Sequence, residues 1–216
     1  MAELDLLRSL PRTKRNIQKR AAGKDEAVVA IARQYGEMYW DGPREYGYGG
    51  YRYDGRWRAV ARDIIAHFGL AAGMRVLDVG CGKGFLVTDL MLECPGLEVF
   101  GLDVSLYALM HCEREAIGRL HLGTAEKMPF PDGSFDCVLS LNTIHNFPRP
   151  RAVRAMQEIQ RLSGGRAFVQ VDSYHTPEQK EIFESWVLTA EFHDYPPGWI
   201  ELFEEAGYTG DYYWTI

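Results

Sequence analysis

Residues 76–85 of this 216-residue chain read Val76-Leu-Asp-Val-Gly-Cys-Gly-Lys-Gly-Phe85. An apolar run leads into three alternate glycines, and a second apolar segment begins directly after them. Glycine adopts backbone conformations barred to other residues and lets a ligand approach the main chain closely. The pattern therefore predicts a strand at 75–79, a ligand-binding turn at 80–84 and a helix at 85–93.

Strand-like and helix-like segments alternate on both sides of this turn. Further strands are expected at 98–102, 120–122, 135–141, 166–172 and 211–216. Further helices are expected at 25–39, 56–68, 105–117, 151–162, 177–189 and 197–206. This alternation predicts an α/β fold, a Rossmann-like, doubly wound and mostly parallel sheet of six or seven strands with helices on both faces. We assign residues 58–216 to this domain, and residues 1–57 to an N-terminal extension made of a basic arm, a helix and a lid rich in tyrosine and glycine.

The C-terminal residues leave the number of strands open. Residues 211–216 are aromatic and β-branched, which favours a strand. As an edge strand it would need a cover for its unpaired backbone groups. We expect six strands, or a seventh contributed by another part of the chain or by a second subunit, which would make a homodimer. A chain that continues beyond residue 216 is the remaining alternative.

The net charge of -6 is unevenly distributed. Residues 1–24 hold seven of the 24 basic residues but only two of the 30 acidic ones, so the rest of the chain is strongly acidic. An acidic body disfavours nucleic acid as a partner, because phosphate contacts need a basic face. We expect the basic arm to be a solvated terminus, and an anionic partner for it is the alternative.

Hydropathy and cysteine spacing indicate the compartment. No apolar run is long enough to span a bilayer, and the N-terminus lacks the apolar core of a secretory signal. The four cysteines lack the paired spacing of zinc sites or disulfide frameworks. We therefore expect a soluble cytoplasmic protein with no membrane partner and no metal.

An acidic residue and two further blocks accompany the glycine turn. Asp103 ends the second strand, 23 residues after Gly80, where a carboxylate can accept both hydroxyls of a ribose. The block Gly123-Thr-Ala-Glu-Lys-Met-Pro-Phe130 follows the third strand. The block Asp132-Gly-Ser-Phe-Asp-Cys-Val-Leu-Ser-Leu-Asn142 runs through the fourth. These features place one ligand site at the carboxyl ends of the strands.

Over residues 73–172 the order and spacing of these blocks resemble the class I S-adenosylmethionine-dependent methyltransferases. The similarity is to the small-molecule branch that includes ubiquinone and menaquinone biosynthesis enzymes. It implies S-adenosylmethionine as the cofactor and adenosylhomocysteine as the product. The cofactor-binding residues that the resemblance implies are Asp78, Gly80, Cys81, Gly82, Asp103, Val104, Thr124, Ala125, Glu126 and Asn142.

The resemblance also implies what each of these residues does. Asp78 and the turn at 80–84 would hold the methionine part, Asp103 the ribose, and Val104 would pack on adenine. Residues 124–126 would frame the adenine amino group, and Asn142 would close the site near the sulfonium.

Two positions depart from the family's pattern. Thr124 stands where the family commonly has an aspartate, and its hydroxyl still accepts one hydrogen bond. Adenine recognition would then depend more on backbone groups. Lys83 is uncommon inside the turn, and we expect it to face solvent, with a contact to an anionic substrate as the alternative.

Methyl transfer from a sulfonium is an in-line displacement that mainly needs alignment, although a hydroxyl or ammonium acceptor also needs a base. His145 follows the fourth strand, and histidine titrates near neutral pH, so it is the first candidate base. Its alternative role is to order the loop. Asp172 and His175 follow the fifth strand as further catalytic candidates. Tyr174 and His193 are expected to contact the acceptor.

Residues 40–57 are too rich in glycine for a regular element and carry many aromatic side chains. Tyr46, Tyr51 and Arg52 are the residues that we expect in a mobile lid, which would exclude water from the site. The alternative is ordinary packing of the tyrosines against the sheet edge.

The predicted activity is transfer of a methyl group to a small-molecule acceptor by O- or N-methylation. A sugar, sugar nucleotide, phenol or amine fits the polar candidate residues. A nucleic-acid methyltransferase is the first rival, but Asn142-Thr-Ile-His145 stands where amino-methylating enzymes of that class carry Asn/Asp-Pro-Pro-aromatic. A nicotinamide-dependent oxidoreductase is the second, but Phe85 occupies the position of its third glycine.

Overall fold

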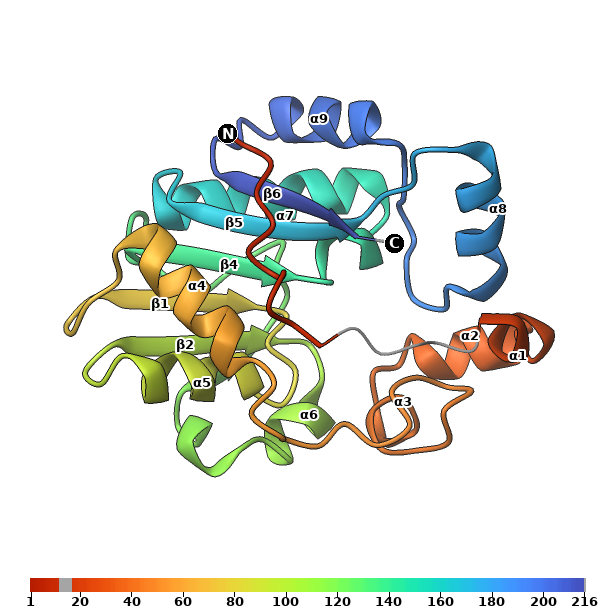
Figure 1. Cartoon of the computed structure of the whole chain (residues 1–216), viewed down its shortest axis with the longest axis horizontal. Helices are drawn as coiled ribbons and strands as arrows, with labels where there is room; N and C mark the ends of the chain where they lie inside the picture. Colours follow the sequence, from red (N-terminus) through yellow and green to blue (C-terminus); the bar gives the residue numbers. More distant parts are fainter. Residues whose placement is uncertain (12–16, 216) are drawn as a thin grey trace.

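The computed structural model describes residues 1–11 and 17–215. In these residues six strands form one parallel sheet in the order β3-β2-β1-β4-β5-β6 (Figure 1). The strands are β1 (Arg75–Val79), β2 (Glu98–Asp103), β3 (Leu120–Leu122), β4 (Cys137–Leu141), β5 (Ala167–Asp172) and β6 (Asp211–Thr215). The expected α/β fold with six parallel strands is confirmed.

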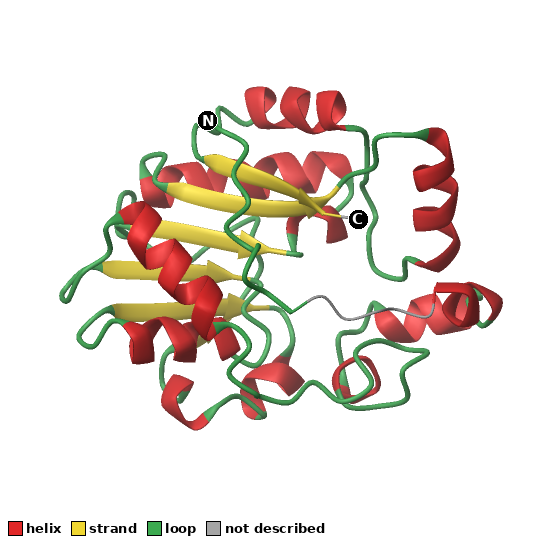
Figure 2. Ribbon diagram, viewed as in Figure 1, coloured by secondary structure: helices red, strands yellow, loops and turns green. Residues whose placement is uncertain are grey.

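Helices pack on both faces of the sheet (Figure 2). The α-helices are α1 (Ile17–Ala22), α2 (Glu26–Ala32), α3 (Glu37–Trp40), α4 (Arg58–Phe68), α5 (Phe85–Glu93), α6 (Leu106–Met110), α7 (Arg149–Ser163), α8 (Pro177–Trp186) and α9 (Pro196–Glu205), and the 3-10 turns are η1 (Arg114–Ala116) and η2 (Ile144–Asn146). Buried residues of α4 and α5 form one apolar layer, and those of α7 and α9 form the other. None of the helices in the described ranges is long and apolar enough to cross a bilayer.

The central strands are apolar along nearly their whole length because both faces of the sheet are covered. In β4 every residue is buried, and in β1 every residue after Arg75 is buried. Asp78 pairs with Gly101 of β2 and with Leu139 of β4. The carboxyl ends of these three strands therefore meet at one edge, where the glycine turn begins.

Two expected helices are shorter than their sequence patterns indicated. The segment 25–39 divides at Tyr35, which has a φ of 50°, and Gly36 then caps α3. The indole of Trp40 donates to the carbonyl of Tyr35 at 3.0 Å and stabilises this break. The segment 105–117 ends as a helix at Met110, because the N–H of Glu113 bonds the carbonyl of Lys83 in the glycine turn instead.

The edge of β6 is covered by the first residues of the same chain. Leu4 donates its backbone N–H to Tyr212, and Tyr212 donates to Ala2, so Glu3 forms an isolated parallel bridge to this strand. Leu6 and Leu7 are buried in the apolar layer that contains α4. These two leucines anchor the start of the arm by burying apolar surface, whereas residues 1–3, 8 and 9 are exposed as expected. Part of the edge of β6 is thus covered within the chain itself.

Residues 17–57 lie beside the carboxyl end of the sheet, next to α8 (Figure 1). Lys24 donates to the carbonyl of Glu184 at 2.5 Å, and Arg33 donates to the carbonyls of Leu188 and Ala190 at 3.3 Å each. These contacts hold α1 and α2 against α8 and against the connection that follows it. The glycine-rich segment that follows them is thereby brought to the glycine turn.

Candidate cofactor-binding site

The glycine turn approaches other parts of the chain too closely for side chains. Gly80, Gly82 and Gly84 all have positive φ angles, which disfavour residues with a Cβ. A Cβ on Gly80 would overlap the side chain of Thr143, and one on Gly82 would lie 2.7 Å from the indole of Trp40. The turn therefore requires glycine both for its backbone conformation and for the space around it.

Asp103 links the end of β2 to this turn. Its Oδ2 accepts the N–H of Gly82 at 2.7 Å, and its Oδ1 accepts the N–H of Ser105 at 2.8 Å. Each carboxylate oxygen can accept more than one hydrogen bond, so acceptor capacity remains. Asp103 also lines the cavity described below.

Asp78 is a buried carboxylate at the end of β1, with only 4% of its surface exposed. Burial, and secondly the charge of Asp103, raise its pKa to about 7. No described side chain or backbone group makes a recorded hydrogen bond to this carboxylate. A cationic group entering the site would stabilise its ionised form.

Two adjoining hollows lie at the carboxyl edge of the sheet. The larger has a volume of about 260 Å³ and is lined by residues that include Asp103 and Glu191. The smaller has a volume of about 50 Å³ and is lined by residues that include Asp78 and Cys81. The residues that line both hollows are Trp40, Tyr48, Gly80, Leu141 and Asn142. The two hollows therefore adjoin each other at the glycine turn, beside Trp40 and Tyr48.

One end of the larger hollow is an apolar slot. Its walls include Leu102, Val104, Ala125 and Phe147. Val104 is 49% exposed, so its side chain is accessible to a ligand. Apolar lining of this kind suits a flat ring system such as a purine.

The residues around Ala125 have divided roles. Ala125 lines the slot, whereas Thr124 and Glu126 are absent from the described lining of both hollows. Glu126 accepts hydrogen bonds from Arg151 and Arg154, and those from Arg151 lower its pKa most. Glu126 thus orients Arg151, which does line the cavity, rather than facing the slot itself.

Asn142 borders both hollows just after β4. Its φ is 55°, a left-handed conformation that asparagine tolerates better than most residues. Its backbone N–H donates to the side-chain oxygen of Gln170 at 2.9 Å, which fixes the strained residue to β5. The amide side chain is therefore held where the two hollows join.

Aromatic side chains from the N-terminal segment cover the glycine turn. The rings of Trp40 and Tyr48 stack in parallel at 5.2 Å, and Tyr51 stacks on Phe85 of α5 at 4.4 Å. Tyr39 packs edge-to-face against Trp40 at 5.1 Å. We call residues 37–53 the aromatic cover.

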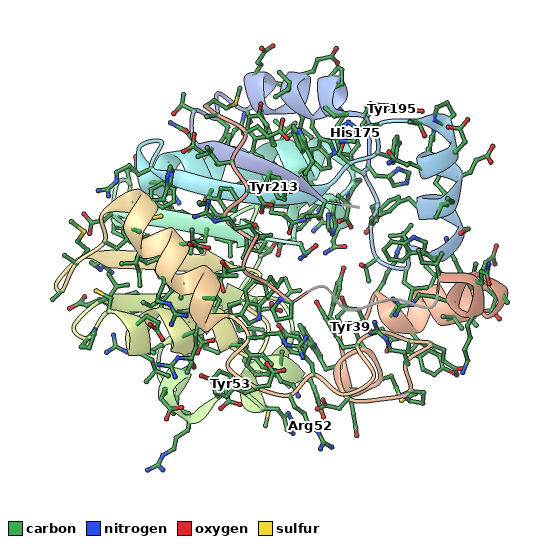
Figure 3. The ribbon with its side chains drawn as sticks, in the orientation of Figure 1. Tyr39, Arg52, Tyr53, His175, Tyr195 and Tyr213 are labelled. Carbon is green, nitrogen blue, oxygen red and sulfur yellow. The ribbon has the colours of Figure 1, made fainter. Side chains whose placement is uncertain are left out.

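The aromatic cover differs in part from the expected lid. Tyr51 lines the smaller hollow, as a lid residue would. Tyr46 is outside the described lining of both hollows, and Arg52 is exposed at the outer margin of the molecule (Figure 3). Trp40 lies within the expected segment 40–57 and contacts the turn, although it was not singled out, and Tyr39 lies just outside that segment.

Lys83 does not face solvent, contrary to expectation. Its side chain is buried, and its Nζ lies 2.8 and 2.7 Å from the two carboxylate oxygens of Asp41. The ammonium also donates to the carbonyl of Tyr51 at 3.0 Å. The ion pair with the aromatic cover provides the partner that a buried charge requires.

The candidate catalytic residues are only partly brought together. His145 is 5% exposed, and its Nδ1 accepts the backbone N–H of Asp172 at 3.1 Å. The carboxylate of Asp172 accepts the hydroxyl of Thr215 at 3.0 Å. Neither residue is in the described lining of the two hollows, although Asn146 and Phe147 beside His145 are. The geometry therefore gives His145 a role in joining η2 to β5.

Tyr174 and His193 form a separate pair above α8. The hydroxyl of Tyr174 lies 3.2 Å from Nδ1 of His193, and both rings pack against Phe183. His175 is exposed near Tyr195, at a distance from Tyr39 (Figure 3). In the described ranges these side chains border neither hollow, and no cluster of three metal-ligating residues occurs.

Arg33 and Glu191 reach the cavity where the histidines do not. Both come from segments outside the four sequence blocks. Arg33 donates to the carbonyl of Ala190, and Glu191 is the next residue. No local pattern marks either one, because only the contact between α2 and the connection to α9 brings them together.

Comparison with known proteins agrees with this site. Residues 77–169 match a family described as a methyltransferase domain. The chain is 35% identical over 123 residues to the demethylmenaquinone methyltransferase of Thermus thermophilus, covering 54% of each protein. It is also 35% identical over 116 residues to sterol 24-C-methyltransferase ERG6B of Gibberella zeae, covering 49% of this chain and 30% of that protein. The chain thus spans about half or less of the length of these relatives.

A solved structure shares the fold at low sequence identity. Geranyl diphosphate C-methyltransferase from Streptomyces coelicolor, in complex with Mg2+, geranyl diphosphate and S-adenosyl-L-homocysteine, superposes with a TM-score of 0.57 at 16% identity. The match covers 70% of this chain and 60% of that one. The parallel sheet with helices on both faces is that of a Rossmann-like α/β domain. Residues 77–169 are therefore similar to a methyltransferase domain, and the relatives and the solved structure named above are methyltransferases.

Proposed function

We propose that this domain binds S-adenosylmethionine and transfers its methyl group to a small polar acceptor. The observation that carries the proposal is the position of Asp103. Its carboxylate holds the N–H of Gly82 and also lines the larger hollow. A ribose at that point would donate hydrogen bonds to Asp103 next to a glycine turn whose backbone a ligand can approach closely.

The residues present fit this cofactor from end to end. The apolar slot around Val104 and Ala125 suits adenine, and Asp103 has acceptor capacity for the ribose hydroxyls. The smaller hollow holds Asp78, a buried carboxylate suited to an ammonium group. Cys81 borders the same hollow, and burial raises the pKa of its thiol, so it serves packing rather than nucleophilic chemistry.

S-adenosylmethionine would supply a methyl group already activated by a positive sulfur. The chain's own residues then have to align the acceptor, exclude water and accept a proton. Asn142 stands where the hollows join, which suits orientation of the reacting groups. Trp40 and Tyr48 cover the same point and keep bulk water from it.

We propose Glu191 as the base for an acceptor that loses a proton. Glu191 and Asp103 are the two carboxylates in the described lining of the larger hollow, and Asp103 is already bonded to the turn. His145 is less suitable, because its Nδ1 already accepts the N–H of Asp172 and its ring is buried outside the hollow. Asp172 and His175 likewise have no contact with the cavity that would support catalysis.

The polar part of the lining of the larger hollow favours a polar acceptor. It consists of side chains such as Arg33, Asn142, Asn146, Arg151 and Glu191. A sugar, sugar nucleotide, phenol or amine would find both donors and acceptors among them. The relatives named for a sterol and for demethylmenaquinone suggest larger apolar acceptors for those proteins. Nucleic acid is disfavoured by the acidic body.

We further propose that the protein acts in a reducing compartment such as the cytoplasm. All four cysteines are free thiols, as expected for a protein in a reducing compartment.

The segment that covers the edge of β6 comes from the same chain, which supports a monomer. Residues 17–57 would act as a covering unit on the methyltransferase domain.

Calorimetric titration with adenosylhomocysteine tests the cofactor proposal, with NAD as the comparison ligand. We expect adenosylhomocysteine to bind and NAD not to bind. Asp103→Ala should weaken binding by at least ~1.5 kcal/mol, because charge-assisted hydrogen bonds to the ribose are lost. Asp136→Ala is the matched control, since Asp136 also accepts a backbone N–H, that of Arg75, but at the opposite edge of the sheet. Equal affinity of the wild type and Asp103→Ala contradicts the assignment.

Incubation with a methyl-labelled cofactor and a metabolite extract tests the acceptor class. Label in a small polar metabolite supports the proposal. Label found only in nucleic acid would contradict it, and so would label only in an apolar lipid.

A further inference from the structure

We propose that Lys83 is a positioning residue that holds the aromatic cover on the cofactor site. The inference rests on the proposed function, because it assigns a role at that same site. Lys83 lies inside the glycine turn, and only 6% of its surface is exposed. Its three recorded polar contacts all reach the aromatic cover, two to Asp41 and one to the carbonyl of Tyr51.

These contacts satisfy the donor capacity of the ammonium group, which has three hydrogens and no acceptor. A buried ammonium is stable only when it is paired and hydrogen-bonded. Removing either partner would leave an uncompensated charge in the turn. The buried position of Lys83 therefore depends on the aromatic cover being in place, and the cover depends on Lys83.

The ion pair acts directly beside the rings that close the site. Asp41 follows Trp40, whose indole lies against Gly82, the residue before Lys83. The N–H of Tyr51 donates to Asp41 at 3.2 Å and to the carbonyl of Trp40 at 3.0 Å. Trp40 thus contacts Gly82 and Asp41 pairs with Lys83, so two consecutive residues of the cover bind two consecutive residues of the turn.

Asp41 carries a second contact that strengthens the pair. The hydroxyl of Tyr107 on α6 donates to Asp41 at 2.9 Å. Burial acts to raise the pKa of Asp41, but the hydrogen bonds from Lys83 and Tyr107 outweigh burial and lower it. Asp41 is therefore an anion under ordinary conditions, as the ion pair requires.

The other end of the cover is held independently of Lys83. The hydroxyl of Tyr53 donates to the buried carboxylate of Asp89 on α5 at 2.5 Å. Loss of Lys83 should therefore release residues 40–51 while residue 53 stays attached. This difference gives the proposal a local signature that general destabilisation would not produce.

The test compares Lys83→Met with Arg56→Met. Arg56 forms an exposed ion pair with Asp54 at 2.6 Å close to the same segment, so its variant removes an equal charge without touching the turn. The measured quantities are the dissociation constant of adenosylhomocysteine and amide hydrogen exchange in the full chain. For Lys83→Met we expect at least tenfold weaker binding and faster exchange in residues 40–51. For Arg56→Met we expect affinity within twofold of the wild type.

Further variants separate positioning from folding. Asp41→Asn should weaken binding in the same direction, and adding it to Lys83→Met should have little further effect, because both act through one pair. Lys83→Arg should restore part of the affinity. If Lys83→Met fails to fold, Asp41→Asn and Tyr107→Phe carry the same test from the cover side.

Affinity within twofold of the wild type in Lys83→Met and Asp41→Asn, with unchanged exchange at 40–51, would overturn the proposal. A lower melting temperature with unchanged affinity would also overturn it, since that is a purely structural role. If the wild type binds no adenosylhomocysteine, the proposed function fails. Hydrogen exchange in the ligand-free variants then still decides whether Lys83 holds the cover.

Discussion

Asp78 and Asp103 stand at the ends of neighbouring parallel strands, and their proximity changes the chemistry of the site. Burial of Asp78, together with the charge of Asp103, raises the pKa of Asp78 to about 7. The ligand-free protein therefore exchanges a proton at this carboxylate in the physiological range. Two consequences can be measured, one for ligand affinity and one for stability.

Affinity for adenosylhomocysteine should increase with pH. If its ammonium pairs with the Asp78 carboxylate, binding below pH 7 must first remove a proton. We expect affinity to rise about tenfold from pH 6 to pH 8 and to change little above that. Calorimetry at pH 7 in buffers of different ionisation enthalpy should show proton release. In Asp78→Asn the pH dependence should vanish, and a flat profile in the wild type would contradict the pairing.

Stability of the ligand-free protein should depend on the same carboxylate with the opposite sign. The unfolded chain ionises Asp78 near pH 4, whereas the folded chain keeps its proton until about pH 7. The folded state therefore binds more protons between these values, and its stability falls as pH rises through them. Above pH 7 the penalty is constant.

The Asp78→Asn variant removes that penalty. We expect it to be more stable than the wild type at pH 8 by about 2–4 kcal/mol in urea unfolding, although it binds the ligand poorly. The difference should shrink as the pH falls from 7 towards 4. Equal pH dependence of the two proteins would show that Asp78 is an ordinary exposed carboxylate in solution.

Local sequence patterns were sufficient to predict the positions of the strands and of the glycine turn. Gly80 and Asp103 could be placed because each follows an apolar strand, and because parallel strands end at one edge. The division of the segment 25–39 could not be predicted. It depends on Trp40 bonding back to Tyr35, a contact that has no helical period.

The surroundings of Lys83 and His145 show the limit of sequence reasoning. Lys83 looked exposed because its partner, Asp41, lies 42 residues earlier on a separate segment. His145 looked like a base because it follows a strand beside the site. The direction of its ring depends on a hydrogen bond from β5, which only the folded sheet supplies.

Replacement of His145 should lower stability, whereas replacement of Glu191 should lower turnover. His145→Ala leaves the N–H of Asp172 without its acceptor, so we expect a loss of about 1–3 kcal/mol in unfolding free energy. Glu191→Gln should instead lower turnover of an O- or N-acceptor by about 10²-fold, with unchanged affinity for adenosylhomocysteine. Urea unfolding and single-turnover assays with the labelled acceptor measure both. A large loss of turnover in His145→Ala at full stability would make His145 the base instead.

Gly80 offers a test in which strain and contact can be separated within one chain. Gly80 and Gly73 both have a φ of 83°, but a Cβ at Gly73 would meet nothing within 4 Å, whereas one at Gly80 would overlap Thr143. Gly73→Ala should therefore lower the free energy of unfolding by the backbone strain alone, about 1–3 kcal/mol, with normal ligand affinity.

Gly80→Ala should add steric displacement at the point where the two hollows join, and weaken adenosylhomocysteine binding more than tenfold. Thr143→Ala in the Gly80→Ala background should restore part of that affinity, because it removes the nearest side-chain atoms. Equal affinity of the Gly73→Ala and Gly80→Ala proteins would mean that the close approach at Gly80 has no part in forming the site.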